Sequence, residues 1–490
     1  MANYTDVQNA FYAELKKEVN ESAAIQTKSM TNALPFEQEG TAGFAWFWNM
    51  SGKINKLSYD LMNTATSYNN QTGAIKASNN SVTATALDIY TALQYRFSEE
   101  DQKAINASQT AASSQINAVT TAWNQANQPK ITDAQKQAAN VNTDIDFISY
   151  TFLSVWGEGK VSWIDITDTD EPRKLFPKMP PSAESILDSF VTYVSTTSSV
   201  ATIQNNMLSS SWLKNKLIAA LKTPATTNGG VNVKSPSTGD EAIKPGYDNP
   251  PATNAILDSL NSAGAITITL TASKSSSSEV IVSVGGKIAG TIPVDFITFT
   301  GSAGASYNSF STQGTGDSVK IEITWNGPTV LNFQPTKFDR SNKTGWYSQQ
   351  TLADAFLNKD VGAGEQPKKS GYVLLGLSPA YKLGNQGNCG YINAALIANP
   401  PSIKMTYEQG DYNTFQSHFK EESSWGVSIF GIKLFGGSQS YEKSVSQKES
   451  NGKGFSITFP PVKLSTTTTP AAEQLASVLA VQVAWLGVAQ

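Results

Sequence analysis

Apolar residues recur at helical spacing through the first 222 residues. From Thr132 to Trp156, apolar positions alternate at steps of three and four and predict one stripe along a long helix. They are Ala138, Val141, Ile145, Ile148, Phe152 and Val155. Thr132 is the predicted N-cap, and Asp133 suits the positive end of the helix dipole. A long helix with one apolar face needs partners, which places it near the middle of a helical bundle.

The flanking segments predict those partners. Val7, Phe11, Leu15 and Val19 form an apolar ridge that predicts a helix over residues 5–20. Another helix is expected to open at Ser98, because three acidic residues follow it, and to end before Asn127. Further helices are predicted over 52–69, 81–97, 182–194 and 203–221, with a short strand near 161–166. Residues 1–222 therefore predict an antiparallel helical bundle.

The pattern changes after residue 222. Residues 223–254 contain five prolines without apolar periodicity, which predicts an inter-domain linker. Residues 264–335 alternate apolar and polar side chains, and Asn326-Gly327 is a strong signal for a short hairpin. We therefore expect a small antiparallel β-sandwich over residues 255–340.

Residues 341–490 predict a β-rich module with a short helix at 341–358. The apolar residues of segment 470–490 nearly encircle a helix, so we expect a buried C-terminal helix there. The predicted fold class is α+β and multidomain: an N-terminal antiparallel helical bundle followed by antiparallel β-sandwich-like C-terminal modules.

Composition excludes several classes of function. The chain has 490 residues and a net charge of −4, which argues against nucleic-acid binding. A single cysteine, Cys389, excludes an internal disulfide framework, and a single histidine, His418, excludes metal sites built from several imidazoles. Phosphate-loop, dinucleotide-binding and G-x-S-x-G motifs are absent. No cofactor or metal is predicted.

Charged residues make up only 16% of the chain, and Ser, Thr, Asn and Gln take their place. Such a surface is common in secreted proteins, toxins, phage parts and self-assembling shells. The first residues have no basic region followed by an apolar one, and no apolar run reaches 18 residues. The expectation is synthesis in soluble form in the cytoplasm, followed by release or secretion by a non-Sec route.

One motif suggests catalysis. Gln386-Gly387-Asn388-Cys389-Gly390, followed by an apolar run interpreted as a helix, resembles the active-site junction of papain-like enzymes. That resemblance implies a thiolate at a helix N-terminus, with His418 as the only available base. The chain lacks the second cysteine and the tryptophan of that pattern. Acidic groups at Asp165/Asp168/Asp170 and Glu421/Glu422 are candidates for a divalent ion or acid–base chemistry, against the alternative of solvated loop acids.

Two segments are candidates for membrane interaction. The aromatic residues Phe44, Trp46, Phe47 and Trp48 form either a buried plug or an anchor at a membrane surface. The segment 424–450 predicts an amphipathic hairpin turning at Gly436-Gly437, either inserted in a bilayer or on the surface of a sandwich. Its candidate membrane-facing residues are Trp425, Val427, Ile429, Phe430 and Phe435.

A helical bundle followed by β-modules resembles the layout of pore-forming insecticidal toxins. We therefore expect a non-enzymatic, membrane-active protein in which the bundle or the hairpin inserts and a β-module recognises its target. The expected partners are a membrane or a cell-surface ligand such as a glycan or receptor, with homo-oligomers in the active state and no nucleic acid. The alternative is a self-assembling shell, filament, phage or injection-system protein, and the third hypothesis is a cysteine hydrolase using Cys389.

Overall fold

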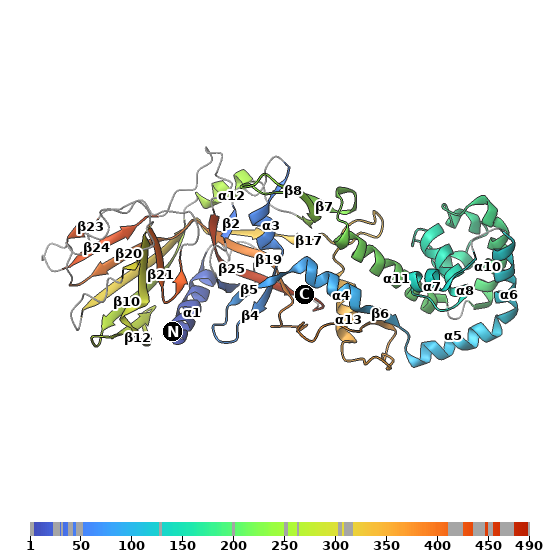
Figure 1. The fold of residues 1–490 in the computed structure, drawn as a ribbon, viewed down its shortest axis with the longest axis horizontal. Helices are drawn as coiled ribbons and strands as arrows, with labels where there is room; N and C mark the ends of the chain where they lie inside the picture. Colours follow the sequence, from blue (N-terminus) through green and yellow to red (C-terminus); the bar gives the residue numbers. More distant parts are fainter. Residues whose placement is uncertain are drawn as a thin grey trace.

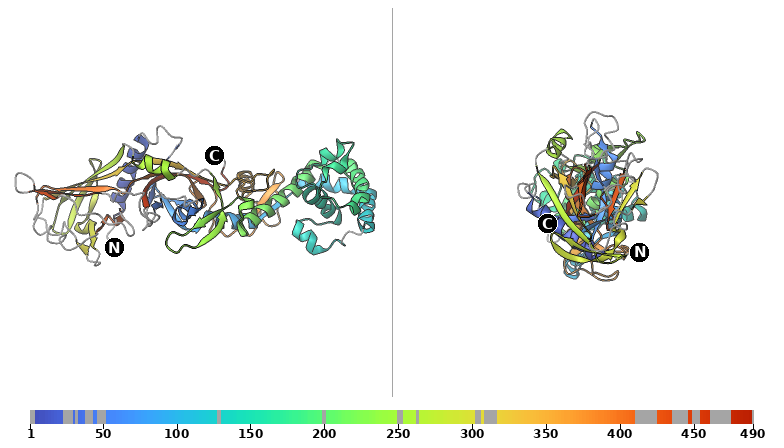
Figure 2. Two further views of the ribbon diagram at one scale, coloured as in Figure 1. Left: turned by 90° about the horizontal axis from the view of Figure 1, so that it is seen from above. Right: turned by 90° about the vertical axis from the view of Figure 1, so that its left-hand side faces the viewer.

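Three hydrophobic cores follow one another along an elongated molecule (Figures 1 and 2). The computed structural model describes residues 4–22, 30, 33–37, 43–45, 52–126, 130–197, 201–248, 253–261, 264–301, 306–307, 317–409, 425–434, 446–448, 454–460 and 475–488. The chain is a mixed α+β protein with several separate sheets. We name the three parts the helical end (residues 99–222), the central part, whose core includes Phe36, Tyr90 and Ile392, and the β end, whose core includes Phe11, Ile268 and Ile323.

The helical end has a core of its own, formed by buried residues between Ala112 and Leu208. Its main elements are α5 (Glu99–Ala111), α6 (Ser113–Gln125), α7 (Asp133–Ala139), α8 (Asp144–Tyr150), the π-helix η1 (Thr151–Trp156), α9 (Trp163–Thr167), α10 (Glu184–Thr197) and α11 (Ala201–Lys222). The rings of Phe152 and Phe190 stack with centroids 4.1 Å apart and join η1 to α10. Helix α11 runs back towards the central part (Figure 1).

The predicted single helix from Thr132 to Trp156 is interrupted. Thr132 does cap α7, in a capping box with Gln135. Asn140 then adopts a left-handed backbone conformation with φ of 57°, which ends α7, and Thr143 caps the next helix. The apolar stripe is correct for Ile145, Ile148 and Phe152, which are buried, whereas Val155 is 49% exposed.

The prediction of a helical bundle over all of residues 1–222 is wrong before residue 98, because that region also contributes strands β1–β6. Ser98 does begin α5, its side chain accepting from the Asp101 backbone N–H, and the predicted first helix is α1 (Thr5–Glu21). The helix expected over 52–69 gives way to a strand after Asn63, and the one over 81–97 does so at Leu93. The short strand expected near 161–166 is instead the helix α9.

The central part is organised by a seven-stranded sheet that closes on itself. Its strands are β1 (Leu34–Glu37), β2 (Gly43–Ala45), β4 (Thr64–Tyr68), β5 (Ile75–Ser81), β16 (Thr329–Asn332), β19 (Gly390–Ala398) and β25 (Leu475–Trp485). Pairing runs β19–β4–β5–β1–β25 and returns from β25 to β19. Helices α3 (Lys56–Met62), α4 (Val82–Ala92), α12 (Thr253–Leu260) and α13 (Gln349–Leu357) also belong to this part.

The predicted C-terminal helix over 470–490 is wrong within the described residues, because Leu475–Trp485 is the strand β25. It pairs with β19 from Ser477 to Trp485 and with β1 and β2 on its other edge. A strand covered on both faces has a nearly continuous apolar sequence, which periodicity alone does not distinguish from a buried helix. The apolar run after Cys389, also interpreted as a helix, is the strand β19 for the same reason.

The segment 223–254 is not an irregular linker where it is described. It forms the antiparallel pair β7 (Gly230–Lys234) and β8 (Glu241–Pro245), and β7 also pairs with β3 (Ile54–Asn55). The Trp346 indole N–H donates to the carbonyl of Gly246 at 2.7 Å, which fixes the hairpin to the loop before α13. Pro245 is the last residue of β8 and Pro236 lies just after β7, where a missing N–H group does little harm.

The β end contains the second seven-stranded sheet and a four-stranded sheet. The first comprises β10 (Ala265–Lys274), β11 (Glu279–Val284), β12 (Lys287–Pro293), β15 (Ser318–Asn326), β20 (Ser402–Tyr407), β23 (Ser446–Lys448) and β24 (Phe455–Phe459). The second comprises β13 (Ile297–Gly301), β14 (Ser306–Tyr307), β21 (Trp425–Ile429) and β22 (Ile432–Lys433). The alternation predicted for β10, β11 and β15 is confirmed by their buried and exposed positions.

Asn326-Gly327 does not close the predicted hairpin. Strand β15 pairs with β10 and β20, whereas β16, directly after the turn, pairs with β19 in the central sheet. Gly327 has φ of +67°, and a Cβ atom there would lie 2.0 Å from the carbonyl oxygen of Leu260. Asn326-Gly327 does form a turn, but this turn connects a strand of one sheet to a strand of another.

Candidate functional site

The candidate membrane hairpin is shorter than the sequence suggested and turns elsewhere. Strands β21 and β22 pair across Phe430 and Gly431, which both have positive φ (54° and 77°), as two-residue hairpin turns require. The turn expected at Gly436-Gly437 lies outside the described residues. Ser446–Lys448, expected near the end of the return strand, pairs with β24 instead. The predicted pairing over 424–450 is therefore wrong.

Helix α1 packs mainly on β10, β11 and β12 and reaches this hairpin at its turn. Its buried residues Val7, Phe11 and Leu15 share a core with Val427, Ile429 and Phe430, all at most 4% exposed. The Gln8 side-chain amide donates to the carbonyl of Phe430 at 2.8 Å. The opposite face of α1 carries exposed residues, so the helix is amphipathic and separates one side of β10, β11 and β12 from solvent.

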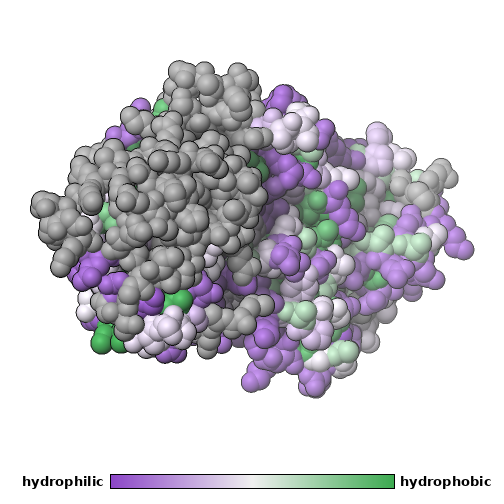
Figure 3. Space-filling view, turned by 60° about the vertical axis from the view of Figure 1, so that its left-hand side comes forward, coloured by the Kyte–Doolittle hydropathy of each residue, from purple (hydrophilic) through white to green (hydrophobic). Residues whose placement is uncertain are grey.

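The remaining candidate membrane residues are only partly placed. Phe44 lies in β2, is 2% exposed and belongs to the central core. Trp46, Phe47, Trp48 and Phe435, and the side chain of Trp425, lie outside the described residues. In the part of the chain that the structure describes, no helix is both long and apolar enough to cross a bilayer. Hydrophobic residues are scattered among hydrophilic ones on the coloured part of the face in Figure 3.

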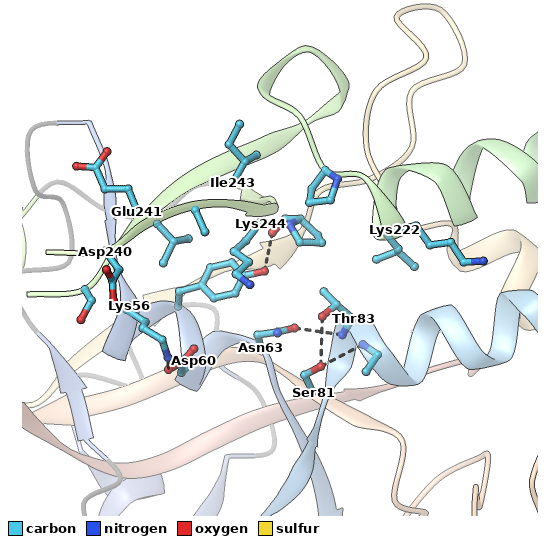
Figure 4. A pocket seen from close by; sticks show the side chains of 18 of the residues that line it. Lys56, Asp60, Asn63, Ser81, Thr83, Lys222, Asp240, Glu241, Ile243 and Lys244 are labelled. Atoms are coloured by element: carbon cyan, nitrogen blue, oxygen red, sulfur yellow. Dashed lines mark hydrogen bonds and ion pairs between the residues drawn. The ribbon is translucent and has the colours of Figure 1, made fainter. Parts of the chain in front are cut away.

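A cavity of about 800 Å³ lies beneath the β7–β8 hairpin (Figure 4). Helix α3, the start of α4 and the end of α11 form its other walls. The Tyr59 hydroxyl donates to the carbonyl of Pro245 at 2.9 Å and anchors the end of β8 over α3. Near that anchor, a Cβ atom at Gly246 would lie 2.2 Å from the oxygen of Gly229, so only glycine fits there.

The charges around this cavity balance. Three lysines and three acids line it: Lys56, Lys222, Lys244, Asp60, Asp240 and Glu241. Lys56 pairs with Asp60 along α3, and Glu241 pairs with Lys53 and with Lys234 outside the cavity. Hydrogen bonds from these two lysines hold the pKa of the Glu241 carboxyl below its usual value. The cavity wall therefore has no strong excess of either charge.

The polar centre of the cavity is Asn63, which closes α3. Its side-chain oxygen accepts from the Thr83 backbone N–H at 3.1 Å and from the Tyr247 hydroxyl at 3.0 Å. Ser81 caps α4 by accepting from the Ala84 N–H at 3.1 Å. The lining residues include no cysteine or histidine. This arrangement suits binding of a polar molecule, and sequence reasoning missed it because its walls come from segments as far apart as Tyr59 and Pro245, 186 positions from each other.

Cys389 is not in the environment of an activated nucleophile. It is 1% exposed, precedes a strand, and belongs to the central core. Burial raises the pKa of its thiol to about 12, whereas a helix N-terminus would lower it. His418, the base implied by the resemblance to papain-like enzymes, lies outside the described residues.

The acidic clusters do not converge. Asp165 accepts from the backbone N–H and the hydroxyl of Ser162, both at 2.7 Å, at the start of α9. Asp168 and Asp170 are exposed. Glu421 and Glu422 lie outside the described residues. Within the described ranges, no three His, Cys, Asp or Glu side chains are grouped to hold a metal ion.

Comparison with known proteins gives no family. No protein-family model, curated protein or solved structure matches the chain. The functional argument therefore depends on the geometry of the covered hairpin and of the cavities.

Proposed function

We propose that this protein is a non-enzymatic, membrane-active protein of the pore-forming toxin type. The observation that supports it best is the packing of the amphipathic helix α1 on β10, β11 and β12, over the core in which Val427, Ile429 and Phe430 are buried. In this arrangement, moving one helix exposes the apolar face of these strands and opens the core that holds the hairpin. Exposed apolar surface of that kind binds membranes or oligomerises.

Helix α1 is suited to act as a cover. Two of its polar contacts are known: the Gln8 amide donates to the carbonyl of Phe430 in the hairpin turn, and the Tyr4 hydroxyl donates to Asp295, just before β13, at 3.3 Å. A small cavity of about 30 Å³ separates Phe11 and Leu15 of the helix from Ile432 and Leu434. Imperfect packing of this kind lowers the cost of separating two surfaces.

The other two parts fit this proposal as separate units. The helical end has its own core, so we propose it as the bundle of the earlier prediction, able to move without unfolding the rest. We propose the two sheets of the β end as the sandwich-like module. The outer face of β10 and β15 presents a ladder of polar pairs, including Thr267 and Thr324 with hydroxyls 3.0 Å apart. That face is one surface available for a cell-surface ligand, with homo-oligomers forming at the membrane.

Release of a dye from liposomes tests the proposal. The full chain is added to vesicles of neutral and of anionic lipid, between pH 4.5 and 8, before and after limited proteolysis. Leakage in at least one condition is expected. Its absence across pH, proteolysis and lipid composition contradicts the proposal.

A disulfide between α1 and β12 tests directly whether α1 must move away from the sheet before the protein releases dye. The Cβ atom of Asp6 lies 3.7 Å from the position of a Cβ at Gly290, within the range of disulfides. The double variant Asp6→Cys/Gly290→Cys should release dye only after reduction. Each single variant should behave like the wild type, oxidised or reduced. Equal leakage from the oxidised and reduced double variant contradicts a role for α1, even if the protein is membrane-active.

Assembly into a shell or filament is the second candidate, and an edge strand favours it. Strand β12 lies at the edge of its sheet, with Ile288 79% exposed and Ile281 of the neighbouring strand 39% exposed. The other argument for assembly, an apolar C-terminal helix, no longer holds because that segment is β25. Negative-stain images of the pure protein distinguish the candidates: large symmetric particles without lipid favour assembly, and dispersed single molecules favour membrane action.

A further inference from the structure

A second cavity, of about 500 Å³, lies where the helical end meets the central part. Its walls come from β6 (Leu93–Arg96) with Phe97, the helix α5 that follows, the turn between α7 and α8, and the loop after α13. Met207 of α11 also lines it. A ligand in this cavity therefore touches both parts of the molecule.

The polar lining is dominated by carboxamides. Six of them face the cavity: Gln94, Gln102, Asn106, Asn140, Asn142 and Gln366. The Gln102 amide donates to the Asn106 oxygen at 2.9 Å, which orients this pair along α5. A carboxamide presents two donors and an acceptor without charge.

The charged groups at the cavity are already engaged with the protein backbone. The Arg96 guanidinium donates to the carbonyls of Gly362, Ala363 and Glu365 at 2.6 to 3.1 Å, which holds the loop after α13 in place. The Glu365 carboxylate accepts from the Gly362 N–H at 3.0 Å. The Asp146 carboxyl is hydrogen-bonded to the side chain and the backbone of Thr143, and burial nevertheless raises its pKa above the ordinary value. An ionic ligand would therefore compete with the contacts that shape the cavity.

Aromatic rings form part of the wall. Tyr95 and Phe97 lie edge to face with centroids 5.8 Å apart, and Tyr95 meets Tyr372 in the same way on the other side. Phe97 is partly exposed and lines the cavity. An aromatic ring beside carboxamides suits a molecule with C–H groups on one face and hydroxyls around its rim.

We propose that this cavity binds a neutral saccharide. Each sugar hydroxyl both donates and accepts, and so does each carboxamide, so the two match without a buried unpaired charge. The ring C–H groups would pack on Phe97. The proposal rests on the proposed function, because it names a neutral saccharide as the cell-surface ligand and places it in this cavity instead of on the outer face of β10 and β15. Sugar binding at this junction also fixes the helical end against the central part, so it should stabilise the folded chain.

Saturation-transfer difference NMR with the full chain tests the proposal. The probes are neutral trisaccharides of glucose, of N-acetylglucosamine, of mannose and of galactose, with sialyllactose as the charged comparison. We expect at least one neutral trisaccharide to bind, with a Kd on the order of millimolar or tighter, and to bind better than sialyllactose. Binding of none, or preference for the charged sugar, overturns the proposal.

Variants test whether the saccharide binds in this cavity. A Cβ atom at Gly364 meets nothing within 4 Å, so Gly364→Leu should fold and crowd the cavity, whereas Gly364→Ala should bind nearly as the wild type does. Asn106→Asp, which removes an amide donor, should weaken binding on the order of tenfold. Asn332→Asp, on an exposed position of β16, is the matched control. Binding unchanged in both Gly364→Leu and Asn106→Asp overturns the assignment. The assay contains no lipid, and the leakage assay contains no sugar, so either proposal can fail alone.

Discussion

The Nζ atom of Lys343 lies 3.3 Å from Oε1 of Glu158, an ion pair that joins the central part to the helical end. Lys160 approaches the other carboxylate oxygen at 3.4 Å. Next to this pair, Gly159 packs on the indole of Trp212, where a Cβ atom would lie 3.3 Å from the ring. The ring of Trp212 in turn meets Phe338 of the central part edge to face, with centroids 6.0 Å apart, so an aromatic contact accompanies the charges at this junction.

Replacing Glu158 by Gln should reduce the loss of thermal stability that occurs as the pH falls from 7 to 3. Hydrogen bonds from Lys343 and Lys160 hold the pKa of the Glu158 carboxyl below its ordinary value of 4.5. The stabilisation is therefore present above the unfolded pKa and is lost as pH falls through the folded one. Thermal unfolding from pH 7 to pH 3 should show a smaller loss in Glu158→Gln than in the wild type. Glu171→Gln, which breaks an exposed pair within η2 (Pro172–Leu175), is the control and should leave the pH profile unchanged.

Two glycines with the same backbone conformation should differ strongly in their tolerance of alanine. Gly327 and Gly286 have φ of +67° and +79°, but a Cβ atom meets the Leu260 carbonyl at 2.0 Å in the first case and nothing within 4 Å in the second. Gly286→Ala should cost about 1 kcal/mol of unfolding free energy, from the strained conformation alone. Gly327→Ala should cost several kcal/mol, because α12 must also move. Urea titrations measure both, and equal costs would show that the chain relaxes at Gly327.

Elements with local signals were predictable. The helix α1 followed from its apolar ridge, and Ser98 and Thr132 both cap helices as their sequences indicate. The strands β10, β11 and β15 followed from strict alternation, because one face is buried and the other meets solvent. In each of these cases, the residues that determine the element lie close together in the sequence.

Elements defined by distant partners were not predictable. Strands β19 and β25 lie in a closed sheet with both faces covered. Their apolar residues are therefore nearly continuous and show neither the two-residue alternation of a strand nor the periodicity of a helix. The candidate site depends on the same kind of pairing. Gln8 bonds to Phe430 across 422 positions, and no local pattern shows that an N-terminal helix reaches that hairpin. The role predicted for Val427, Ile429 and Phe430 at a membrane stays a prediction, and their burial in this core could not be read from the sequence.

Separate cores predict separate unfolding. Phe190 is fully buried within the helical end, and Phe11 is 3% exposed within the β end. Either substitution to alanine should cost about 3–5 kcal/mol locally. Hydrogen exchange read by mass spectrometry should show faster exchange over residues 112–208 in Phe190→Ala. In Phe11→Ala, faster exchange should appear in α1, β10 and β11, with the helical end unchanged. Uniformly faster exchange in both variants would mean that the three parts unfold as one.

Cys389 should behave as a structural thiol. Its Sγ lies 3.4 Å from Oδ1 of Asn388, within a core otherwise formed by apolar and aromatic side chains. Because burial raises its pKa to about 12, iodoacetamide at pH 8 should label the native chain far more slowly than the chain in guanidinium. The raised pKa also means that the stability contributed by this group is present below the unfolded pKa, near 9.0, and is lost as pH rises towards 12.

Substitution of the thiol separates packing from reactivity. Cys389→Ser places a hydroxyl in the same apolar site and should cost about 1–3 kcal/mol, measured in urea, while leaving any dye release at neutral pH intact once the variant is folded. Cys389→Ala is the matched control, because it removes the sulfur without adding a polar group. Rapid labelling of the native thiol would contradict the buried position. Loss of dye release in both folded variants would give Cys389 a functional role that its surroundings do not indicate.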